Sequence, residues 1–182
     1  MVHNLQKLNS NSITMKNDEY YTPLDILDYF RGLGANFVYD PASNDKTAIY
    51  LGIPNYDDIE SDGLREGNDW NNFDGDIWIN PPFTLKKQFF MKAVKTFNAG
   101  FKHSIYILVP DKSITNKYMG DFIDALPEEI GVTLYIPNGR ISFIDKNYQP
   151  TKSSFFGSVI YKISYSKTPY SNLVYFKRTI NS

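Results

Sequence analysis

The sequence predicts an α/β fold with a doubly wound, mostly parallel sheet that is completed by a C-terminal antiparallel hairpin. Three observations predict it: strand-like and helix-like segments alternate, two strand-like segments close the sequence, and polar motifs follow directly after strands. Such alternation is typical of parallel sheets, which bind ligands beyond the carboxyl ends of their strands. With 182 residues, 42% of them hydrophobic, the chain can bury one core. We therefore expect a single domain over residues 18–182, preceded by a polar, flexible tail over residues 1–17.

The domain begins with a predicted helix. Thr22 is expected to cap this helix, Pro23 to occupy its first position and Gly34 to end it. Residues 37–39 are expected to form a short strand that leads into a polar loop. In the irregular acidic stretch that follows, we expect one further strand over residues 48–51.

The second half of the domain has a clearer pattern. Phe89, Phe90 and Phe97 recur at helical spacing, which predicts an amphipathic helix over residues 85–99 that ends at Gly100. An unbroken apolar run after this helix is typical of a buried strand. The elements expected beyond the helix are that buried strand at residues 104–110, a helix at 116–125, a strand at 132–136, and two paired strands at 155–164 and 172–177.

Cysteine and histidine are too scarce to build a structural zinc site. The chain has no cysteine, and His3 and His103 are its two histidines. Thiolate sites are therefore excluded, and we expect no metal. The chain also has no apolar run long enough for a membrane span, and its N-terminus lacks the pattern of a signal peptide. We expect a cytoplasmic protein without a membrane partner.

Charge is unevenly distributed along the chain, although the net charge is only −1. Residues 40–80 contain ten acidic and two basic residues, whereas residues 85–118 contain seven basic residues and one acidic residue. Residues 140–182 repeat this basic excess. Individual charges of this kind often belong to solvated faces. Their segregation suits a cationic cofactor in the acidic segment and a phosphate backbone along the basic ones.

The most informative motif is Asn80-Pro81-Pro82-Phe83, which follows an apolar run at residues 76–79. Neither proline can donate a backbone hydrogen bond, so the strand must end here in a stiff loop. The loop leaves the Asn80 amide and the Pro81 carbonyl as acceptors and holds the Phe83 ring beyond them. This suits a planar base with an exocyclic amino group, whose positive charge the acceptors would stabilise during methyl transfer. The alternative is an ordinary proline-rich turn with Phe83 in the core.

Further motifs accompany this loop in a fixed order. The set is Tyr20-Tyr21-Thr22-Pro23, Asp40-Pro41-Ala42-Ser43, Ser61-Asp62-Gly63-Leu64 with Trp70, Asn80-Pro81-Pro82-Phe83, Val109-Pro110 and Gly139-Arg140-Ile141-Ser142-Phe143. Together they resemble the phage-type DNA N6-adenine methyltransferases, over about residues 18–165. The resemblance implies a Rossmann-like methyltransferase fold, S-adenosylmethionine as methyl donor, and the adenine amino group of DNA, the partner, as acceptor.

The resemblance also implies roles for individual residues. The implied catalytic residues are Asn80, Pro81, Pro82 and Phe83, which would meet the target adenine. The implied cofactor-binding residues are Tyr21, Thr22, Pro23, Asp40, Pro41, Ala42, Ser43, Asp62 and Asn80. Among them, Asp40 would meet the cofactor's ammonium group and Asp62 its adenine. The residues best suited to DNA phosphate are Lys86, Lys87, Lys112, Arg140 and Lys152, although Arg140 could equally close a surface ion pair.

Two features depart from the family pattern. No glycine-rich turn follows the first predicted strand, and the ribose-binding acid is not obvious, with Asp57, Asp58 and Glu60 as candidates. Three functions stay open: an adenine N6 methyltransferase, a cytosine N4 methyltransferase, and an inactive relative that binds DNA or a host protein. Whether the protein is a monomer or a homodimer is open as well.

Overall fold

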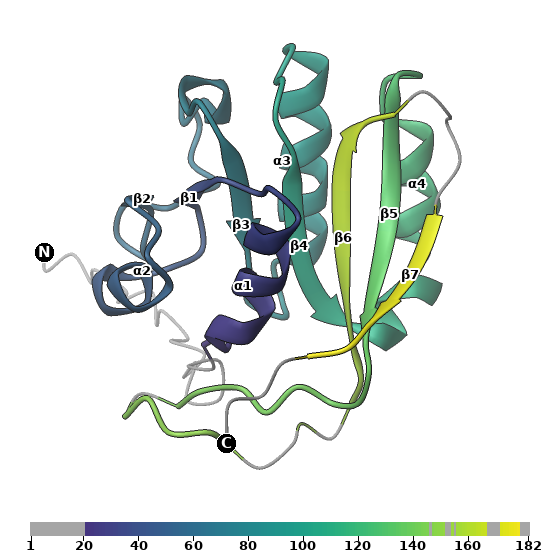
Figure 1. Ribbon diagram of the computed structural model, residues 1–182. Helices are drawn as coiled ribbons and strands as arrows, with labels where there is room; N and C mark the ends of the chain where they lie inside the picture. Colours follow the sequence, from purple (N-terminus) through teal and green to yellow (C-terminus); the bar gives the residue numbers. More distant parts are fainter. Residues whose placement is uncertain (1–20, 146, 152–153, 155, 167–171, 179–182) are drawn as a thin grey trace, which may run out of the picture.

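The computed structural model describes residues 21–145, 147–151, 154, 156–166 and 172–178. Over these residues the chain forms a seven-stranded sheet with helices on both faces (Figure 1). The predicted α/β fold with a doubly wound, mostly parallel sheet is confirmed.

Helices and strands alternate as far as the fifth strand, and two strands follow it. The helices are α1 (Leu24–Gly32), α2 (Asp45–Leu51), α3 (Lys86–Asn98) and α4 (Tyr118–Asp124), with 3-10 helices η1 (Trp70–Asn72) and η2 (Asp111–Thr115). The strands are β1 (Phe37–Asp40), β2 (Asn55–Tyr56), β3 (Asp76–Ile79), β4 (Ile105–Pro110), β5 (Ile130–Pro137), β6 (Ser158–Tyr165) and β7 (Asn172–Phe176).

The order of strands across the sheet places the predicted site motifs together. That order is β2-β1-β3-β4-β6-β5-β7, in which β6 alone is antiparallel to its neighbours. The order changes direction at β1, because β2 lies on one side of it and β3 on the other. Such a switch point is where doubly wound sheets bind ligands. Asp40 ends β1 and Asn80 follows β3, so both lie at the switch point.

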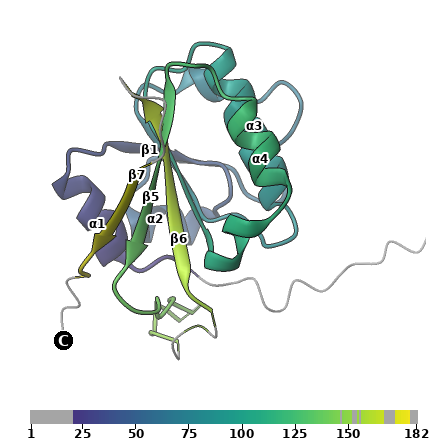
Figure 2. The ribbon, with the colours of Figure 1, turned by 90° about the vertical axis from the view of Figure 1, so that its right-hand side faces the viewer.

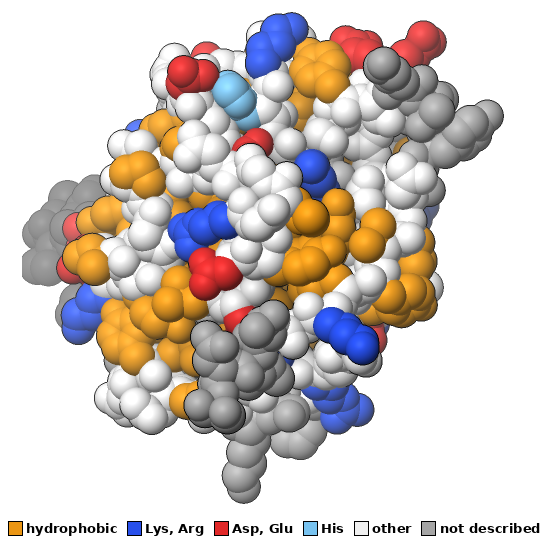
Figure 3. Space-filling view, in the orientation of Figure 1, with side chains coloured by type: hydrophobic (Ala, Val, Ile, Leu, Met, Phe, Trp, Pro, Cys, Tyr) orange, Lys and Arg blue, Asp and Glu red, His pale blue; other side chains and the backbone are white. Residues whose placement is uncertain are grey.

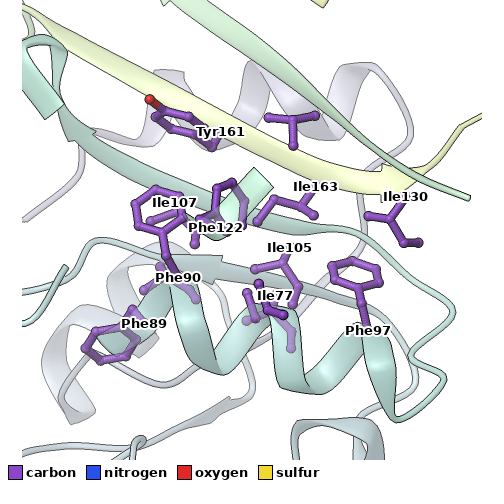
Figure 4. Close-up of a cluster of buried hydrophobic side chains, with 14 of the residues drawn as sticks. Ile77, Phe89, Phe90, Phe97, Ile105, Ile107, Phe122, Ile130, Tyr161 and Ile163 are labelled. Atoms are coloured by element: carbon purple, nitrogen blue, oxygen red, sulfur yellow. The ribbon is translucent and has the colours of Figure 1, made fainter. Parts of the chain in front are cut away.

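Both faces of the sheet are packed by helices. α1 and α2 lie on one face, and α3 and α4 lie on the other (Figure 2). α3 turns Phe89, Phe90 and Phe97 toward the sheet, where they form one buried cluster with Ile77 and Ile105 (Figure 4). The cluster on the opposite face includes Ile26, Leu27, Phe30, Trp78 and Tyr106. Because β3 and β4 are packed from both sides, the loops at their carboxyl ends start from a rigid support.

The predicted C-terminal hairpin is wrong in its pairing. β6 and β7 run in opposite directions as expected, but β5 lies between them and β7 is parallel to β5. The reason is that both edges of β6 are already bonded, one to β4 and the other to β5. β7 can therefore add only to the outer edge of β5.

The strand predicted over residues 48–51 is also wrong, because these residues lie in helix α2. The Asn44 side chain caps this helix and accepts a hydrogen bond of 2.9 Å from the Thr47 backbone N–H. Gly52 ends it with a left-handed backbone at φ 64°, which glycine adopts without strain. The two caps outweigh the strand preference of the residues between them.

The start of α1 differs in one respect from the prediction. The helix begins at Leu24, and Pro23 rather than Thr22 occupies the capping position. Thr22 is therefore one residue too early to cap the helix with its hydroxyl. The helix ends at Gly32, and Gly34 follows with φ 93°.

Two sequence expectations concern the N-terminus and membranes. The tail expected over residues 1–17 lies outside the described residues. Among the helices of the described part, none has both the length and the apolar character that a membrane span requires.

Candidate active site

The carboxylate of Asp40 is the most unusual charged group at the switch point. Its residue is only 2% exposed, and it accepts a hydrogen bond of 3.0 Å from the Ala42 backbone N–H. Burial raises the pKa of this carboxyl to about 7, against the lowering effect of the hydrogen bonds from Ala42 and Ser43. No ion pair between described residues includes Asp40. A cationic ligand would supply the missing positive charge.

Tyr21 and Thr22 come just before α1, which starts near the lower end of the sheet in Figure 1, where β4 also ends. Tyr21 exchanges two backbone hydrogen bonds with Ile144, of 2.8 and 2.9 Å. The Thr22 hydroxyl is buried, and among the described residues its Oγ1 has no hydrogen-bond partner. A buried hydroxyl without a partner costs free energy unless a ligand or water satisfies it.

The loop after β1 is held against the turn at residues 61–64. A Cβ atom added at Gly63 would lie only 2.0 Å from the Pro41 carbonyl oxygen, so glycine permits this contact. Asp62 has a left-handed backbone at φ 50°, and its side chain accepts a hydrogen bond of 3.0 Å from the Leu64 N–H. The contact of Gly63 with Pro41 thus places the neighbouring Asp62 close to the loop after β1.

Asp57 belongs to a buried network that supports these loops. Its carboxylate accepts hydrogen bonds of 2.8 Å from Arg65 Nη1 and Asn68 Nδ2, and one from the Tyr39 hydroxyl. Burial acts to raise the pKa of Asp57, but the hydrogen bonds outweigh it and lower the pKa below its usual value. Its backbone carbonyl accepts from Ser43 N–H at 2.9 Å. These hydrogen bonds hold the β1 loop in place and already occupy the Asp57 carboxylate. This argues against Asp57 as the ribose-binding acid.

The Asp58 carboxylate is likewise occupied by hydrogen bonds within its own loop. Its Oδ1 accepts from the Ser61 backbone N–H at 2.8 Å and from the Ser61 hydroxyl at 2.9 Å. Glu60 is exposed, and its N–H donates to the same Oδ1 at 3.0 Å. The Asp58 side chain thus organises the turn that leads to Asp62.

The Asn80-Pro81-Pro82-Phe83 loop leaves the sheet directly after β3. Pro81 is buried, Asn80 and Pro82 are half-buried, and the Pro82 carbonyl accepts from Leu85 N–H at 2.9 Å. Phe83 is 39% exposed, so the alternative of a turn with Phe83 in the core is wrong. The ring is therefore available to a ligand at the switch point.

Phe156 joins this loop from a distant part of the sequence. Its ring centroid lies 5.5 Å from that of Phe83, at an interplanar angle of 76°. Lys86 Nζ lies 5.3 Å from the Phe83 centroid, and Lys112 Nζ lies 5.8 Å from the Phe156 centroid. Sequence reasoning missed Phe156, because no pattern of spacing connects it to the proline loop.

The other predicted phosphate-binding residues are more scattered. Lys87 is exposed on the first turn of α3, and Arg140 is exposed beside Gly139. No ion pair between described residues includes Arg140, so the structure gives no support to its surface ion pair. Lys152 lies outside the described residues.

A shallow hollow on another part of the surface does not carry this chemistry. It has a volume of ≈ 370 Å³ and lies where apolar side chains gather over α2 in Figure 3. Its lining residues are Ala48, Ile49, Gly52, Ile53, Pro54 and Tyr56. None of them carries a charge or belongs to the predicted site. Within the described residues, no group of acidic and histidine side chains could hold a metal ion either.

Comparison with known proteins identifies a family and finds similar solved structures. The model of the family described as DNA N-6-adenine-methyltransferase (Dam) matches residues 9–181. A solved structure of a predicted O-methyltransferase from Agrobacterium tumefaciens is similar at 12% sequence identity and a TM-score of 0.38. That match covers 88% of this chain and 66% of the other, so the chain spans slightly less than two thirds of its length. No curated protein matches the chain.

Proposed function

The chain belongs to the DNA N-6-adenine-methyltransferase (Dam) family, and on that premise we propose that it transfers a methyl group from S-adenosylmethionine to N6 of adenine in DNA. One observation carries the proposal: the Asn80-Pro81-Pro82-Phe83 loop follows β3 at the switch point of the sheet, and the buried carboxylate of Asp40 ends the neighbouring strand β1. A site for a cation and a site for a planar amine are thus neighbours. Methyl transfer between two bound molecules requires such an arrangement.

The residues at the end of β1 fit the proposed cofactor. Asp40 offers a buried carboxylate to an ammonium group, and Thr22 offers a buried hydroxyl that has no partner among the described residues. Asp62, held next to this loop by the contact of Gly63 with Pro41, is suited to the polar edge of an adenine. When bound, S-adenosylmethionine would supply an electrophilic methyl group on its sulfonium sulfur.

Asn80 and Pro81 would orient the amine of the target base. We infer that Asn80 Oδ1 and the Pro81 carbonyl each accept one N–H of the amino group. The bond between this nitrogen and the methyl carbon would form as the methyl–sulfur bond breaks, which would leave S-adenosylhomocysteine, and the nitrogen would then lose one proton. Both oxygens would stabilise the positive charge that develops on the nitrogen before the proton leaves. The Pro82 carbonyl is already bonded to Leu85 N–H, which favours Pro81 as the second acceptor.

Phe83 would hold the target base in place. Its exposed ring offers a face for stacking on an adenine that has left the helix, which chemistry at an exocyclic amine requires. Cytosine N4 presents the same kind of amine, so the geometry of the loop alone does not separate the two bases. The family membership favours adenine.

Incubation with labelled S-adenosylmethionine and unmodified DNA tests the proposal. We expect the label to appear in DNA, and mass analysis of the digested product to show N6-methyladenine. DNA that already carries N6-methyladenine at every accessible adenine serves as the control and should accept little label. N4-methylcytosine as the product, or cofactor binding without any transfer to DNA, would contradict the proposal.

A further inference from the structure

We propose that Phe83, Lys86, Lys112 and Phe156 form a binding site for an unpaired DNA strand, and that the protein binds single-stranded DNA more tightly than a duplex. This set of residues is called the aromatic–lysine platform below. The proposal deepens the proposed function and rests on it, because the same Phe83 ring is assigned there to the target adenine. Beyond the proposed function, it assigns a binding position to a second base, on Phe156, and a preference for single-stranded over duplex DNA.

Three separate segments build the aromatic–lysine platform. Phe83 and Lys86 come from the loop after β3 and the start of α3, Lys112 from η2 after β4, and Phe156 from the approach to β6. The ring centroids lie 5.5 Å apart, and the lysine ammonium groups lie 5.3 and 5.8 Å from the centroids of Phe83 and Phe156, respectively. Each ring is thus paired with a cation.

The backbone fixes the position of Phe156 relative to Lys112. Asp111 N–H donates a hydrogen bond of 3.0 Å to the Gly157 carbonyl. A Cβ atom at Gly157 would lie 2.4 Å from Asp111 Oδ2, so glycine allows the two segments to meet. The Asp111 carboxylate also accepts from the Lys112 backbone N–H at 2.7 Å. Lys112 and Phe156 are therefore held in register by their neighbours Asp111 and Gly157.

The two aromatic side chains of the platform are more exposed to solvent than the phenylalanines of the adjacent helix α3. Phe83 is 39% exposed and Phe156 is half-buried, whereas Phe89 and Phe90 on the following helix are 3% and 0% exposed. Lys112 is exposed as well. Aromatic faces beside lysines are the combination by which proteins bind single strands, since every base has a face to stack and every nucleotide a phosphate.

The angle between the rings indicates how many bases are bound. Because the rings of Phe83 and Phe156 are inclined at 76°, they cannot cover the two parallel faces of one base. The geometry instead assigns them to two bases, the target adenine on Phe83 and a neighbour on Phe156. Lys86 and Lys112 would then reach the phosphates of these nucleotides. In a duplex, stacking and pairing hide the faces that both rings need.

Fluorescence anisotropy without cofactor tests this preference. The probes are a labelled 12-nucleotide single strand, the duplex of the same sequence and the RNA of the same sequence, at one salt concentration. We expect the single DNA strand to bind most tightly. Phe156→Leu should weaken single-strand binding by roughly tenfold and duplex binding much less, since stacking on one ring is lost. Phe156→Trp should retain single-strand binding, because it keeps an aromatic face.

Tyr175→Leu provides the matched control, because Tyr175 is an aromatic residue of β7 that is 72% exposed and lies outside the platform. It should leave both affinities unchanged. Equal or tighter binding of the duplex by the parent protein, tighter binding of RNA, or equal loss on both DNA probes in Phe156→Leu overturns the inference. N6-methyladenine formed without a single-strand preference would overturn the inference alone. A preference that depends on Phe156, without methyl transfer, would overturn the proposed function alone.

Discussion

The two sides of the candidate active site are built in opposite ways. On the acidic side, Asp40 and Asp57 are buried, and the loops that carry them are bonded to each other. On the basic side, Phe83 and Lys112 are exposed. The proposed cofactor site is thus part of the folded core, whereas the proposed DNA site is a set of side chains on its surface.

This difference predicts how substitutions will behave. A change on the acidic side should alter stability and cofactor affinity together, because the same contacts serve both. A change on the basic side should alter DNA affinity and leave stability close to that of the parent. Asn80 lies between the two sides and should affect the reaction itself.

The largest effect is expected for Asn80→Ala. Loss of one acceptor that stabilises the developing charge should slow methyl transfer by roughly 100- to 1,000-fold. Most of the DNA affinity should remain, and thermal unfolding should show an intact fold. Asn172→Ala, at an exposed position of β7, is the matched control. Methylation by Asn80→Ala at the parent rate would remove Asn80 from the reaction.

Gly63→Ala probes the acidic side. The added Cβ would lie 2.0 Å from the Pro41 carbonyl oxygen, so backbone must move. We expect a loss of about 1–3 kcal/mol in the free energy of unfolding and weaker S-adenosylmethionine binding. Gly120→Ala is the control, since its Cβ in α4 meets nothing within 4 Å and should slightly stabilise the helix. Denaturant titration and calorimetry would show whether stability and cofactor affinity fall together. A fall in one alone would show that the contact of Gly63 with Pro41 does not serve both.

Asp40 gives the acidic side a dependence on pH. Burial raises the pKa of Asp40 to about 7, so this carboxyl is mostly protonated at lower pH. It must then lose its proton before it can pair with an ammonium group. Cofactor affinity should therefore fall by about tenfold for each pH unit between pH 7 and pH 5.5. Asp40→Asn should bind more weakly at pH 7 and show a flat profile in calorimetric titration. A flat profile in the parent protein would place the ammonium group elsewhere.

The free energy of unfolding should also depend on Asp40, but it should fall as pH rises, whereas cofactor affinity should increase. A carboxyl whose pKa is raised in the folded state adds stability that is fully present below its unfolded value of about 3.9 and is lost as pH rises through about 7. In the absence of cofactor, the unfolding temperature of the parent should thus lose this contribution as pH rises over that range. Asp40→Asn should lack it.

The smallest effects are expected for single cations on the basic side. Lys87→Ala and Arg140→Ala should each reduce the slope of log affinity against log salt by about 0.9 for duplex DNA, if each neutralises one phosphate. Lys102→Ala is the control, because Lys102 precedes β4 and so lies at the opposite end of the sheet. Unfolding curves should be unchanged in all three. An unchanged slope for Lys87→Ala or Arg140→Ala would remove that residue from the DNA site.

The common location of Asp40 and Asn80 could be predicted, because proline or polar residues follow the apolar runs at the points where the strands end. The prolines after Ile79 end β3, and the polar run that begins at Asp40 ends β1. In a parallel sheet both ends lie at the same edge, so a topology built from local patterns brings Asp40 and Asn80 together. The amphipathic pattern of α3 was equally informative, because one face of that helix is buried.

Residues 48–51 show where local patterns mislead. Their side chains favour a strand, yet Asn44 and Gly52 cap a helix of seven residues around them. Both caps were visible in the sequence and could have corrected the prediction. For the C-terminal strands no local signal was available. The pairing of β7 depends on β5 already occupying the edge of β6, which is a property of the whole sheet.

Phe156 could not be found from the sequence for a related reason. It reaches Phe83 only because β6 enters the sheet beside β4, which brings residues 111 and 157 into contact. Contacts of this kind depend on long-range pairing. They appear only when the strand order is known.

The insertion of β6 between β4 and β5 also has a consequence for how the chain reaches its fold. β4 and β6 pair from Ile105 with Ile163 to Pro110 with Ser158, so one edge of a fully buried strand is completed by residues made much later. Until those residues emerge during synthesis, the β4 edge is unpaired and apolar, which favours association with other chains. Such non-local pairing also slows folding. The nascent chain therefore exposes an edge that favours aggregation during the interval between synthesis of β4 and of β6.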